Sequence, residues 1–225
     1  MKPILIYVYA GERYLDAAAR FVSCYNAFPA GADHDCTIVC NNCEPDGFVR
    51  SLFGSLANVG FLKHDNSGYD IGAFQLASSI QQPRIALFLG ATAFMQRGGW
   101  MKRVVDSAGR RGLGVYGAMG NRGVDHGGVH PRVWPHIRTT GFWLSTELMN
   151  RYPLKVTQPH HRYAFEHGQG CLSQWAGQQG YPSWVVTWDM EYPEQSWDLI
   201  ENGFHRGDQS NLIFKDRLCE PPYYG

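Results

Sequence analysis

The chain has 225 residues, of which 44% are hydrophobic and 18% charged, so it can bury a substantial core and is not composed like a disordered segment. Twenty basic residues balance twenty acidic ones, which leaves no overall field to attract nucleic acid or an anionic membrane. The apolar run Ile4–Ala10 is too short for a signal peptide or a membrane span, and no other stretch approaches that length. We therefore expect a cytoplasmic protein, whose oligomeric state the sequence does not indicate.

The first half of the chain alternates apolar, β-rich runs with segments of helical periodicity. Strands buried on both faces are predicted at Ile4–Ala10, Asp35–Cys40, Val59–Lys63 and Arg84–Gly90. Helices are expected between them, at about Tyr14–Phe28, Phe48–Leu56 and Asp70–Ile80, and Asp70 is a candidate N-cap. This order predicts an α/β protein with a Rossmann-like, mostly parallel central sheet and helices on both faces.

The residues that follow the four strands are candidates for a ligand site. Sheets of this kind bind ligands beyond the carboxyl ends of their strands, so these residues should converge on one crevice. We expect the following positions there, for binding a nucleotide: Tyr9, Ala10, Gly11, Asn41, Asn42, the segment from His64 to Gly72, Gly90, Ala91 and Thr92.

The second half of the chain is less regular. Its expected elements are helices at Trp100–Arg111, Thr146–Tyr152 and Phe165–Gly177, and strands at Gly112–Met119, His136–Ser145 and Tyr181–Trp188. The glycine-rich stretch Gly120–Pro135 predicts a long loop that could order over a ligand as a lid. The aromatic tail Asp189–Gly225 is expected to wrap the sheet. We expect one domain, with residues 1–119 binding the nucleotide and residues 120–225 serving the acceptor and catalysis.

The cysteines favour packing over metal binding. Alternation places Cys36 and Cys40 on one face of a predicted strand, where a thiol packs as a small hydrophobe. Cys43 is close by, but no fourth ligand stands at zinc spacing, and disulfides are less expected still. The pair His160-His161 also has no partner at ligand spacing, so a solvated turn is favoured there.

The strand-to-helix turn from Asn66 to Phe74, NSGYDIGAF, allows two interpretations. In the first, the glycines permit a ligand to approach the backbone closely and the helix N-terminus offers it free N–H groups. In the second, the same residues only form a turn and cap the helix. The segment resembles the asparagine–glycine–aspartate–isoleucine–glycine segment of the rhamnan synthesis F family and, more loosely, the third-strand motif of family 2 glycosyltransferases. The resemblance implies a GT-A fold in which Asn66, Ser67, Gly68 and Asp70 hold a nucleotide-sugar.

The block from Phe165 to Tyr181 is similar to a second family 2 pattern, in which an acidic residue at the start of a helix is the general base. The matching residue is Glu166, although His167 stands where a second acid is usual. Inverting sugar transfer needs such a carboxylate to take the proton of the attacking hydroxyl. Stabilisation of the helix dipole is the alternative explanation for an acid at that position.

The leaving diphosphate needs positive charge, for which the sequence offers several residues. His205 and Arg206 lie in a late polar block that is either a site or a solvated loop, and Arg138 lies on a strand resembling the one beneath the acceptor in these families. The fourth strand ends in Leu89-Gly-Ala-Thr92 instead of the usual metal-binding Asp-x-Asp. Either Arg138, His205 and Arg206 neutralise the diphosphate, which is favoured, or Asp70 and His205 hold Mg²⁺ or Mn²⁺ weakly.

Together these motifs predict a glycosyltransferase of the hexosyl- or deoxyhexosyltransferase class, acting in polysaccharide biosynthesis. It would move a sugar from a UDP-, GDP- or dTDP-linked donor to a glycan or another hydroxyl acceptor. One alternative is a non-catalytic nucleotide-sugar-binding protein, which the missing metal acids favour. Another is a nucleotidyltransferase, for which Gly11-Glu-Arg13 offers a faint phosphate-binding loop.

Overall fold

The structure, a computed structural model, describes residues 1–122, 124–125, 128–129, 134–204 and 206–219. Its centre is an eight-stranded sheet in the order β13-β12-β6-β11-β4-β1-β2-β3. Four neighbouring parallel strands come from the first half of the chain: β1 (Ile4–Tyr9), β2 (Asp35–Asn41), β3 (Val59–His64) and β4 (Ile85–Leu89).

The remaining four strands extend the sheet beyond β4. The strands β6 (Val115–Gly117) and β12 (Ser183–Val186) are parallel to each other. The strand β11 (Gly141–Ser145) is inserted antiparallel between β4 and β6, and β13 (Glu191–Pro193) is an antiparallel edge strand. Only β11 and β13 therefore oppose the common direction within this sheet, and the prediction of a mostly parallel, Rossmann-like sheet is confirmed.

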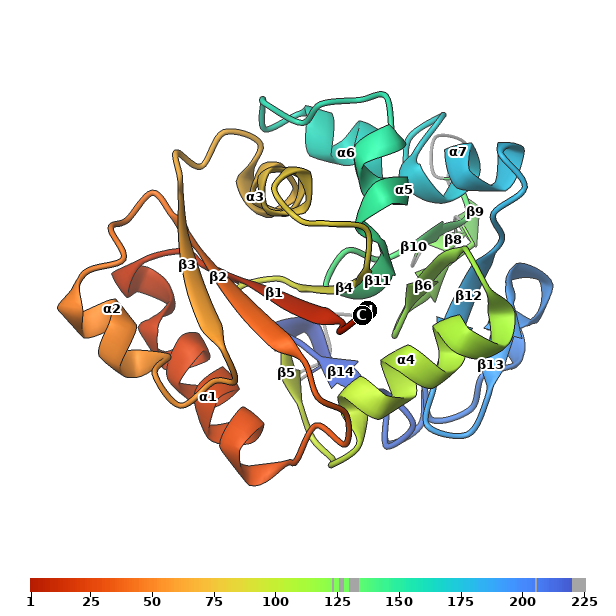
Figure 1. Ribbon diagram of the computed structural model, residues 1–225. Helices are drawn as coiled ribbons and strands as arrows, with labels where there is room; N and C mark the ends of the chain where they lie inside the picture. The colour runs from red at the N-terminus through yellow and green to blue at the C-terminus, as the bar shows by residue number, and fades with distance from the viewer. Residues whose placement is uncertain (123, 126–127, 130–133, 205, 220–225) are drawn as a thin grey trace.

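Helices cover both faces of the sheet, as Figure 1 shows. Alternate residues of β1 explain the two layers, because Leu5, Tyr7 and Tyr9 belong to one buried cluster and Ile4 and Val8 to another. The first cluster is covered by α1 (Leu15–Ala27), α2 (Gly47–Leu52) and α4 (Trp100–Arg111). The second is covered by α3 (Tyr69–Ser79), α5 (Thr146–Arg151), α6 (His161–Glu166) and α7 (Leu172–Gln178).

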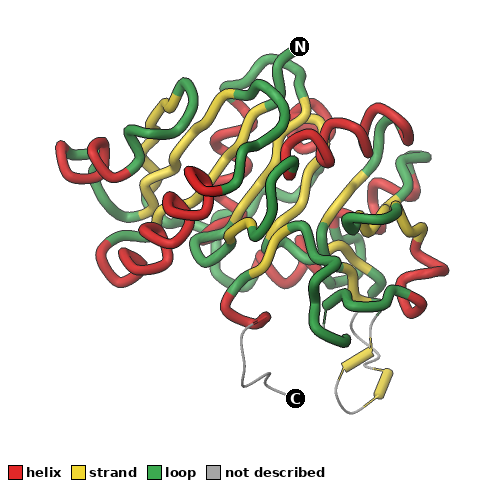
Figure 2. Tube along the Cα trace, turned by 90° about the horizontal axis from the view of Figure 1, so that it is seen from below, coloured by secondary structure: helices red, strands yellow, loops and turns green. Residues whose placement is uncertain are grey.

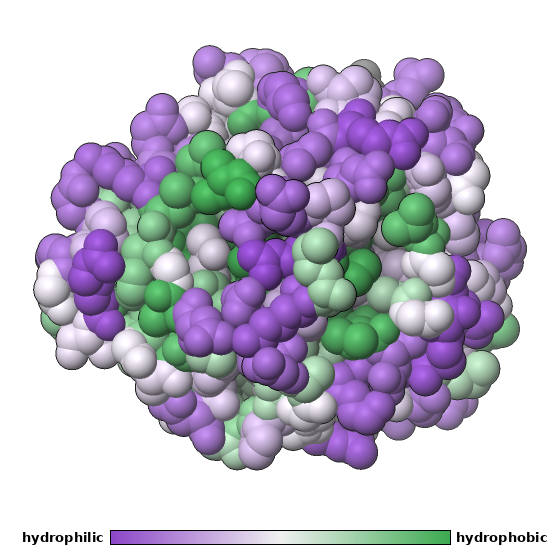
Figure 3. Space-filling model, in the orientation of Figure 1, coloured by the Kyte–Doolittle hydropathy of each residue, from purple (hydrophilic) through white to green (hydrophobic). Residues whose placement is uncertain are grey.

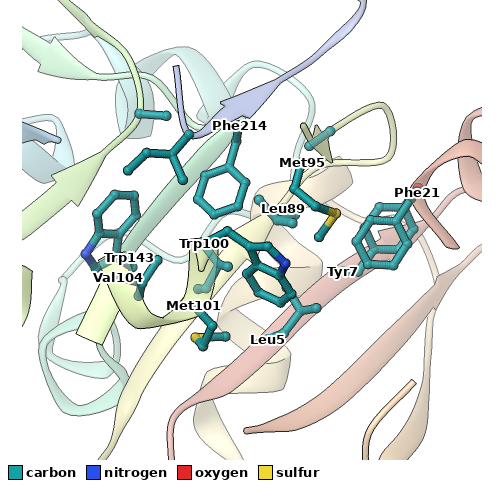
Figure 4. Packing of buried hydrophobic residues seen from close by; sticks show 14 of the residues in the cluster. Leu5, Tyr7, Phe21, Leu89, Met95, Trp100, Met101, Val104, Trp143 and Phe214 are labelled. Atoms are coloured by element: carbon teal, nitrogen blue, oxygen red, sulfur yellow. The ribbon is translucent and has the colours of Figure 1, made fainter. Parts of the chain in front are cut away.

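Aromatic side chains fill the first of these clusters (Figure 4). Tyr7 stacks on Phe21 of α1 with ring centroids 4.0 Å apart. Phe214, far along the chain, packs edge-on against Trp100 and Trp143. The last part of the described chain is thus held by the same core as β1.

Two predicted elements of the second half are each broken in two. The expected strand 136–145 divides into β10 (His136–Ile137) and β11, with a turn at Thr139 and Thr140. The expected helix 165–177 is also wrong, because α6 ends at Glu166 and α7 begins at Leu172. A turn separates these helices and contains Gly170, whose φ of 75° lies outside the helical region.

The expected loop at Gly120–Pro135 contains short strands, β7 (Gly120–Asn121), β8 (Val124–Asp125) and β9 (Gly128–Val129). The rest of that predicted lid lies largely outside the described residues. The tail contributes β13, the 3-10 helix η2 (Glu194–Leu199), β14 (Phe214–Lys215), which pairs with β5 (Phe94–Met95), and the 3-10 helix η3 (Arg217–Cys219). The tail therefore carries more regular structure than the sequence indicates.

The two ends of the described chain lie beyond opposite ends of the strands, the N-terminus at the top and η3 at the bottom of the view in Figure 2. On the face shown in Figure 3, hydrophilic side chains predominate and hydrophobic ones form small separate groups. Among the described helices, none has the length and apolar character needed to cross a bilayer.

Candidate functional site

A cleft of about 650 Å³ opens where the parallel strands end. Each of the four strands contributes residues at or just beyond its last position. We call this set the strand wall: Ala10, Asn41, Asn42, Asn66, Gly90, Ala91 and Thr92. The convergence predicted from the order of elements is therefore present, because parallel neighbours bring their carboxyl ends to one edge.

The opposite side of the cleft comes from elements that are distant in sequence. We call it the charged wall: Thr139, Thr140, Arg162, Tyr163, Glu166 and Arg217. Five further residues complete the lining: Arg13 and Tyr14 of the 3-10 helix η1 (Glu12–Tyr14), and Tyr69, Asp70 and Ile71 at the start of α3.

The backbone beside the strand wall is held in unusual conformations. Asn42, Asn66 and Tyr69 have φ values of 58°, 66° and 55°. Asparagine tolerates this left-handed region, but for a tyrosine it costs on the order of 1 kcal/mol and needs surrounding structure to hold it. The Tyr69 N–H donates to the Asn66 carbonyl at 3.1 Å, which closes the turn before α3. Strain of this kind concentrates at functional sites.

The side chain of His64 links the ends of β2 and β3. Its Nδ1 lies 2.6 Å from Oδ1 of Asn41 and 3.2 Å from the backbone nitrogen of Asn66. Burial lowers the pKa of His64, so the imidazole is neutral near pH 7. Two residues of the strand wall, Asn41 and Asn66, are thereby fixed relative to each other.

Asp70 lies in the cleft but is not the predicted N-cap. That position belongs to Gly68, and Asp70 is the second residue of α3. Its carboxylate accepts a hydrogen bond from the Ala91 N–H, and its Oδ2 would be 3.1 Å from a Cβ placed on Gly90. Burial raises the pKa of Asp70, and the Ala91 N–H and the charge of Arg162 oppose that rise. The carboxylate is therefore seated against the backbone that follows β4.

Glu166 also lies in the cleft, but at the C-terminal end of a helix, whereas the sequence predicted it at the start of one. It is the last residue of α6, where the helix dipole disfavours a carboxylate, so dipole stabilisation does not explain it. Its Oε1 accepts hydrogen bonds from the backbone N–H and the hydroxyl of Thr139, both at 3.0 Å. No described group donates a hydrogen bond to Oε2. One oxygen is anchored and the other is available to a ligand.

Three arginines line the cleft, and none of them is among the residues predicted to stabilise the leaving group. They are Arg13, Arg162 and Arg217. Arg162 lies between two tyrosines, its guanidinium carbon 5.3 Å from the Tyr69 ring centroid and 4.9 Å from that of Tyr163. A signal for Arg162 existed, because it precedes Glu166 by four residues and shares its helix face. Arg217 has no comparable signal in the sequence.

Both arginines that had been predicted to stabilise the leaving group lie elsewhere. Arg138 has its guanidinium carbon 4.7 Å from the Phe204 ring centroid and does not line the cleft. Arg206 lines a separate cavity of about 40 Å³ beside Trp197. His205 lies outside the described residues, so its predicted role stays a prediction.

Several positions predicted to bind the nucleotide also do not line the cleft. Tyr9 is only 2% exposed and packs edge-on against Phe53 in the core. The Ser67 N–H donates to Asp65 in the turn, and Gly11 is the N-cap residue of η1. Gly68 is required by packing, since a Cβ there would lie 2.0 Å from the Val156 carbonyl oxygen. Gly72 is likewise confined, by the Ser67 carbonyl.

The alternative in which Asp70 and His205 hold a metal ion stays a prediction, because His205 lies outside the described residues. Across them, no three His, Cys, Asp or Glu side chains lie close enough together to hold a metal ion. Gly90 and Thr92 follow β4, and the Asp70 carboxylate accepts a hydrogen bond from the Ala91 N–H. All six cysteines are free thiols, and Cys36 and Cys40 are buried in the core as predicted.

The fold is similar to that of several solved structures. A putative glucose-1-phosphate thymidylyltransferase from Bacillus anthracis, in complex with a sucrose, aligns with a TM-score of 0.50 over 85% of this chain and 88% of that chain, at 13% identity. HddC from Yersinia pseudotuberculosis aligns with a TM-score of 0.47 at 13% identity, over 70% of this chain and 83% of that chain. S. aureus TarS 1-349 aligns with a TM-score of 0.42 at 16% identity, over 66% of this chain and 48% of that chain.

At these identities the likeness shows the fold alone. The chain is an α/β protein with a Rossmann-like fold, and its cleft lies at the strand ends. A scan against protein-family models found no match, and neither did a search of curated proteins. The resemblance to the rhamnan synthesis F family therefore stays a prediction from short motifs.

Proposed function

We propose that the protein is a glycosyltransferase that moves a sugar from a nucleoside diphosphate to a hydroxyl group of an acceptor. The observation that carries the proposal is a single cleft in which Glu166 is presented beside cationic side chains at the ends of the parallel strands. The nucleoside would lie along the strand wall, where the amides of Asn41, Asn42 and Asn66 can pair with a base or ribose.

Glu166 would act as the general base. Its Oε1 is held by Thr139, which leaves Oε2 to accept the acceptor's hydroxyl proton. The acceptor oxygen forms a bond to the anomeric carbon while the bond from that carbon to the diphosphate oxygen breaks. The electron pair of the broken bond leaves with the diphosphate, and a single displacement of this kind inverts the configuration.

Arg13 and Arg162 would stabilise the departing diphosphate. Guanidinium groups form charge-assisted, often bidentate hydrogen bonds with phosphate oxygens. Electrostatic stabilisation of developing charge is usually the largest single contribution to catalysis. The stacking of Arg162 between Tyr69 and Tyr163 supports this role, because it restricts the side chain before the donor binds. No step of this proposal passes through a metal ion.

The test is release of UDP, GDP or dTDP from their sugar conjugates with a panel of glycan and small hydroxyl acceptors. Glu166→Gln should lower turnover by about 10²- to 10⁴-fold, the usual contribution of a general base, and leave nucleotide affinity within a few-fold. Glu147→Gln, on the exposed side of α5, is the matched control and should retain activity. Unchanged turnover of Glu166→Gln would remove Glu166 from the mechanism.

Nucleotidyl transfer is the second candidate, and the position of Arg13 favours it. Arg13 follows β1 and lines the cleft, where a triphosphate could lie. No lysine lines the cleft among the described residues, which is why sugar transfer is preferred. Release of pyrophosphate from a nucleoside triphosphate and a sugar 1-phosphate would identify this activity. Donor binding with neither product would indicate a non-catalytic binding protein.

A further inference from the structure

The last described segment of the chain is anchored in the core directly before it reaches the cleft. Ile213 and Phe214 are fully buried, and Phe214 pairs with Met95 in the small β5–β14 sheet. Two residues later Asp216 is only 5% exposed, whereas the next residue, Arg217, is exposed and lines the cleft. The position of Arg217 therefore depends on the residues that hold Asp216.

Asp216 is held from two directions. Its Oδ2 accepts a hydrogen bond from the Thr140 hydroxyl at 2.9 Å, and its Oδ1 accepts one from the Leu218 N–H at 2.9 Å. Its backbone carbonyl accepts from the Cys219 N–H at 3.0 Å. The carboxylate thus ties η3 to the turn before β11, from a position 76 residues along the chain.

The same turn also holds Glu166. Thr139 donates two hydrogen bonds to Glu166, and its neighbour Thr140 donates one to Asp216. Among the described residues, none pairs with the guanidinium of Arg217. Two adjacent threonines consequently tie Glu166 and the backbone directly before Arg217 to the same turn.

We propose that Arg217 binds the diphosphate of the donor, and that Asp216, through Thr140, is the positioning residue that sets Arg217 relative to Glu166. This inference rests on the proposed function, since it assigns a further residue to the same donor. The ligand class is a diphosphate, because the exposed guanidinium of Arg217 lines the same cleft as Arg13 and Arg162 and gives it three cations against the two carboxylates of Asp70 and Glu166.

Pyrophosphate is the probe, because it reports phosphate contacts without a base or a sugar. Calorimetric titration of Arg217→Gln should show about tenfold weaker pyrophosphate binding than the parent protein, the usual value of a charge-assisted hydrogen bond. Arg50→Gln, an exposed arginine stacked on Phe61, is the control and should bind like the parent.

Positioning is tested by a double-mutant cycle. Thr140→Val removes the hydroxyl at nearly constant volume and should weaken pyrophosphate binding about threefold, and Thr140→Ser should restore it. In the Arg217→Gln background, Thr140→Val should cause no further loss, because the residue it positions is already gone. A purely structural role would give losses that add.

Equal pyrophosphate affinity of Arg217→Gln and the parent, or no pyrophosphate binding by the parent, would overturn the role of Arg217. Additive losses in the cycle would overturn the positioning role of Asp216 and Thr140. The assay of nucleoside diphosphate release with Glu166→Gln tests the proposed function separately. A negative result with pyrophosphate therefore does not contradict the proposed function, and a negative result in the release assay does not contradict the binding of pyrophosphate by Arg217.

Discussion

The two walls of the cleft are built in different ways. The strand wall consists of short side chains and backbone at the ends of strands that are buried in the core, and backbone hydrogen bonds hold Asn42 to His64 and Asn66 to Tyr69. The charged wall consists of two threonines and four longer side chains, of which Arg162, Tyr163 and Arg217 are exposed. The strand wall thus supplies a rigid shape, and the charged wall supplies the charge for chemistry.

This difference predicts that mutations behind the strand wall change stability, whereas mutations in the charged wall change function alone. The largest effect is expected for Gly68→Ala. The new methyl group would lie 2.0 Å from the Val156 carbonyl oxygen, at a φ of 73° that alanine disfavours. The free energy of unfolding, measured with urea, should fall by about 3 kcal/mol or more.

Gly109→Ala is the matched control for this substitution. It lies within α4 with nothing within 4 Å of the added Cβ, and it should be neutral or stabilising by about 0.5–1 kcal/mol. A Gly68→Ala protein as stable as the parent would show that the turn beneath the strand wall can move, and the contrast between the walls would be lost.

Arg162→Gln should produce the opposite pattern. Loss of the guanidinium should weaken binding of nucleoside diphosphates about tenfold, while the urea midpoint stays within experimental error of the parent. Arg151→Gln is a suitable control, because Arg151 also stacks on a tyrosine, Tyr181, but lies outside the cleft. Equal affinities of the Arg162→Gln and Arg151→Gln proteins would remove Arg162 from the site.

The smallest effect is expected at Asp70, where the two walls meet. Burial raises the pKa of Asp70 above its unfolded value, so its negative charge opposes folding. Asp70→Asn should therefore increase the free energy of unfolding at pH 7 while weakening donor binding. The gain in stability should shrink as the pH falls to about 4, where the parent carboxyl also becomes neutral.

Urea titrations of both proteins at pH 7 and pH 4 measure this difference. A raised native pKa contributes stability that is fully present below the unfolded pKa and is lost as the pH rises through the native pKa. An Asp70→Asn protein that is less stable than the parent at pH 7 would mean that the Ala91 N–H bond outweighs the burial of the charge.

Much of the strand wall was predictable from the sequence, because its causes are local. Apolar runs such as Ile4–Tyr9 define buried strands, and parallel strands necessarily bring the residues that follow them to one edge. The location of Asn41, Asn66 and Gly90 in the cleft follows from those two facts. The sequence could not separate lining residues from Tyr9 or Gly68, whose burial depends on what packs against them.

The charged wall was decided by the tertiary structure. Motif resemblance selected Glu166 but placed it at the wrong end of a helix, because the break between α6 and α7 interrupts the apparent periodicity. The pairing of Thr140 with Asp216 spans 76 residues, and the residue after Asp216, Arg217, lines the cleft. Periodicity describes neighbours along the chain, whereas contacts of this kind form only once the core has brought distant segments together.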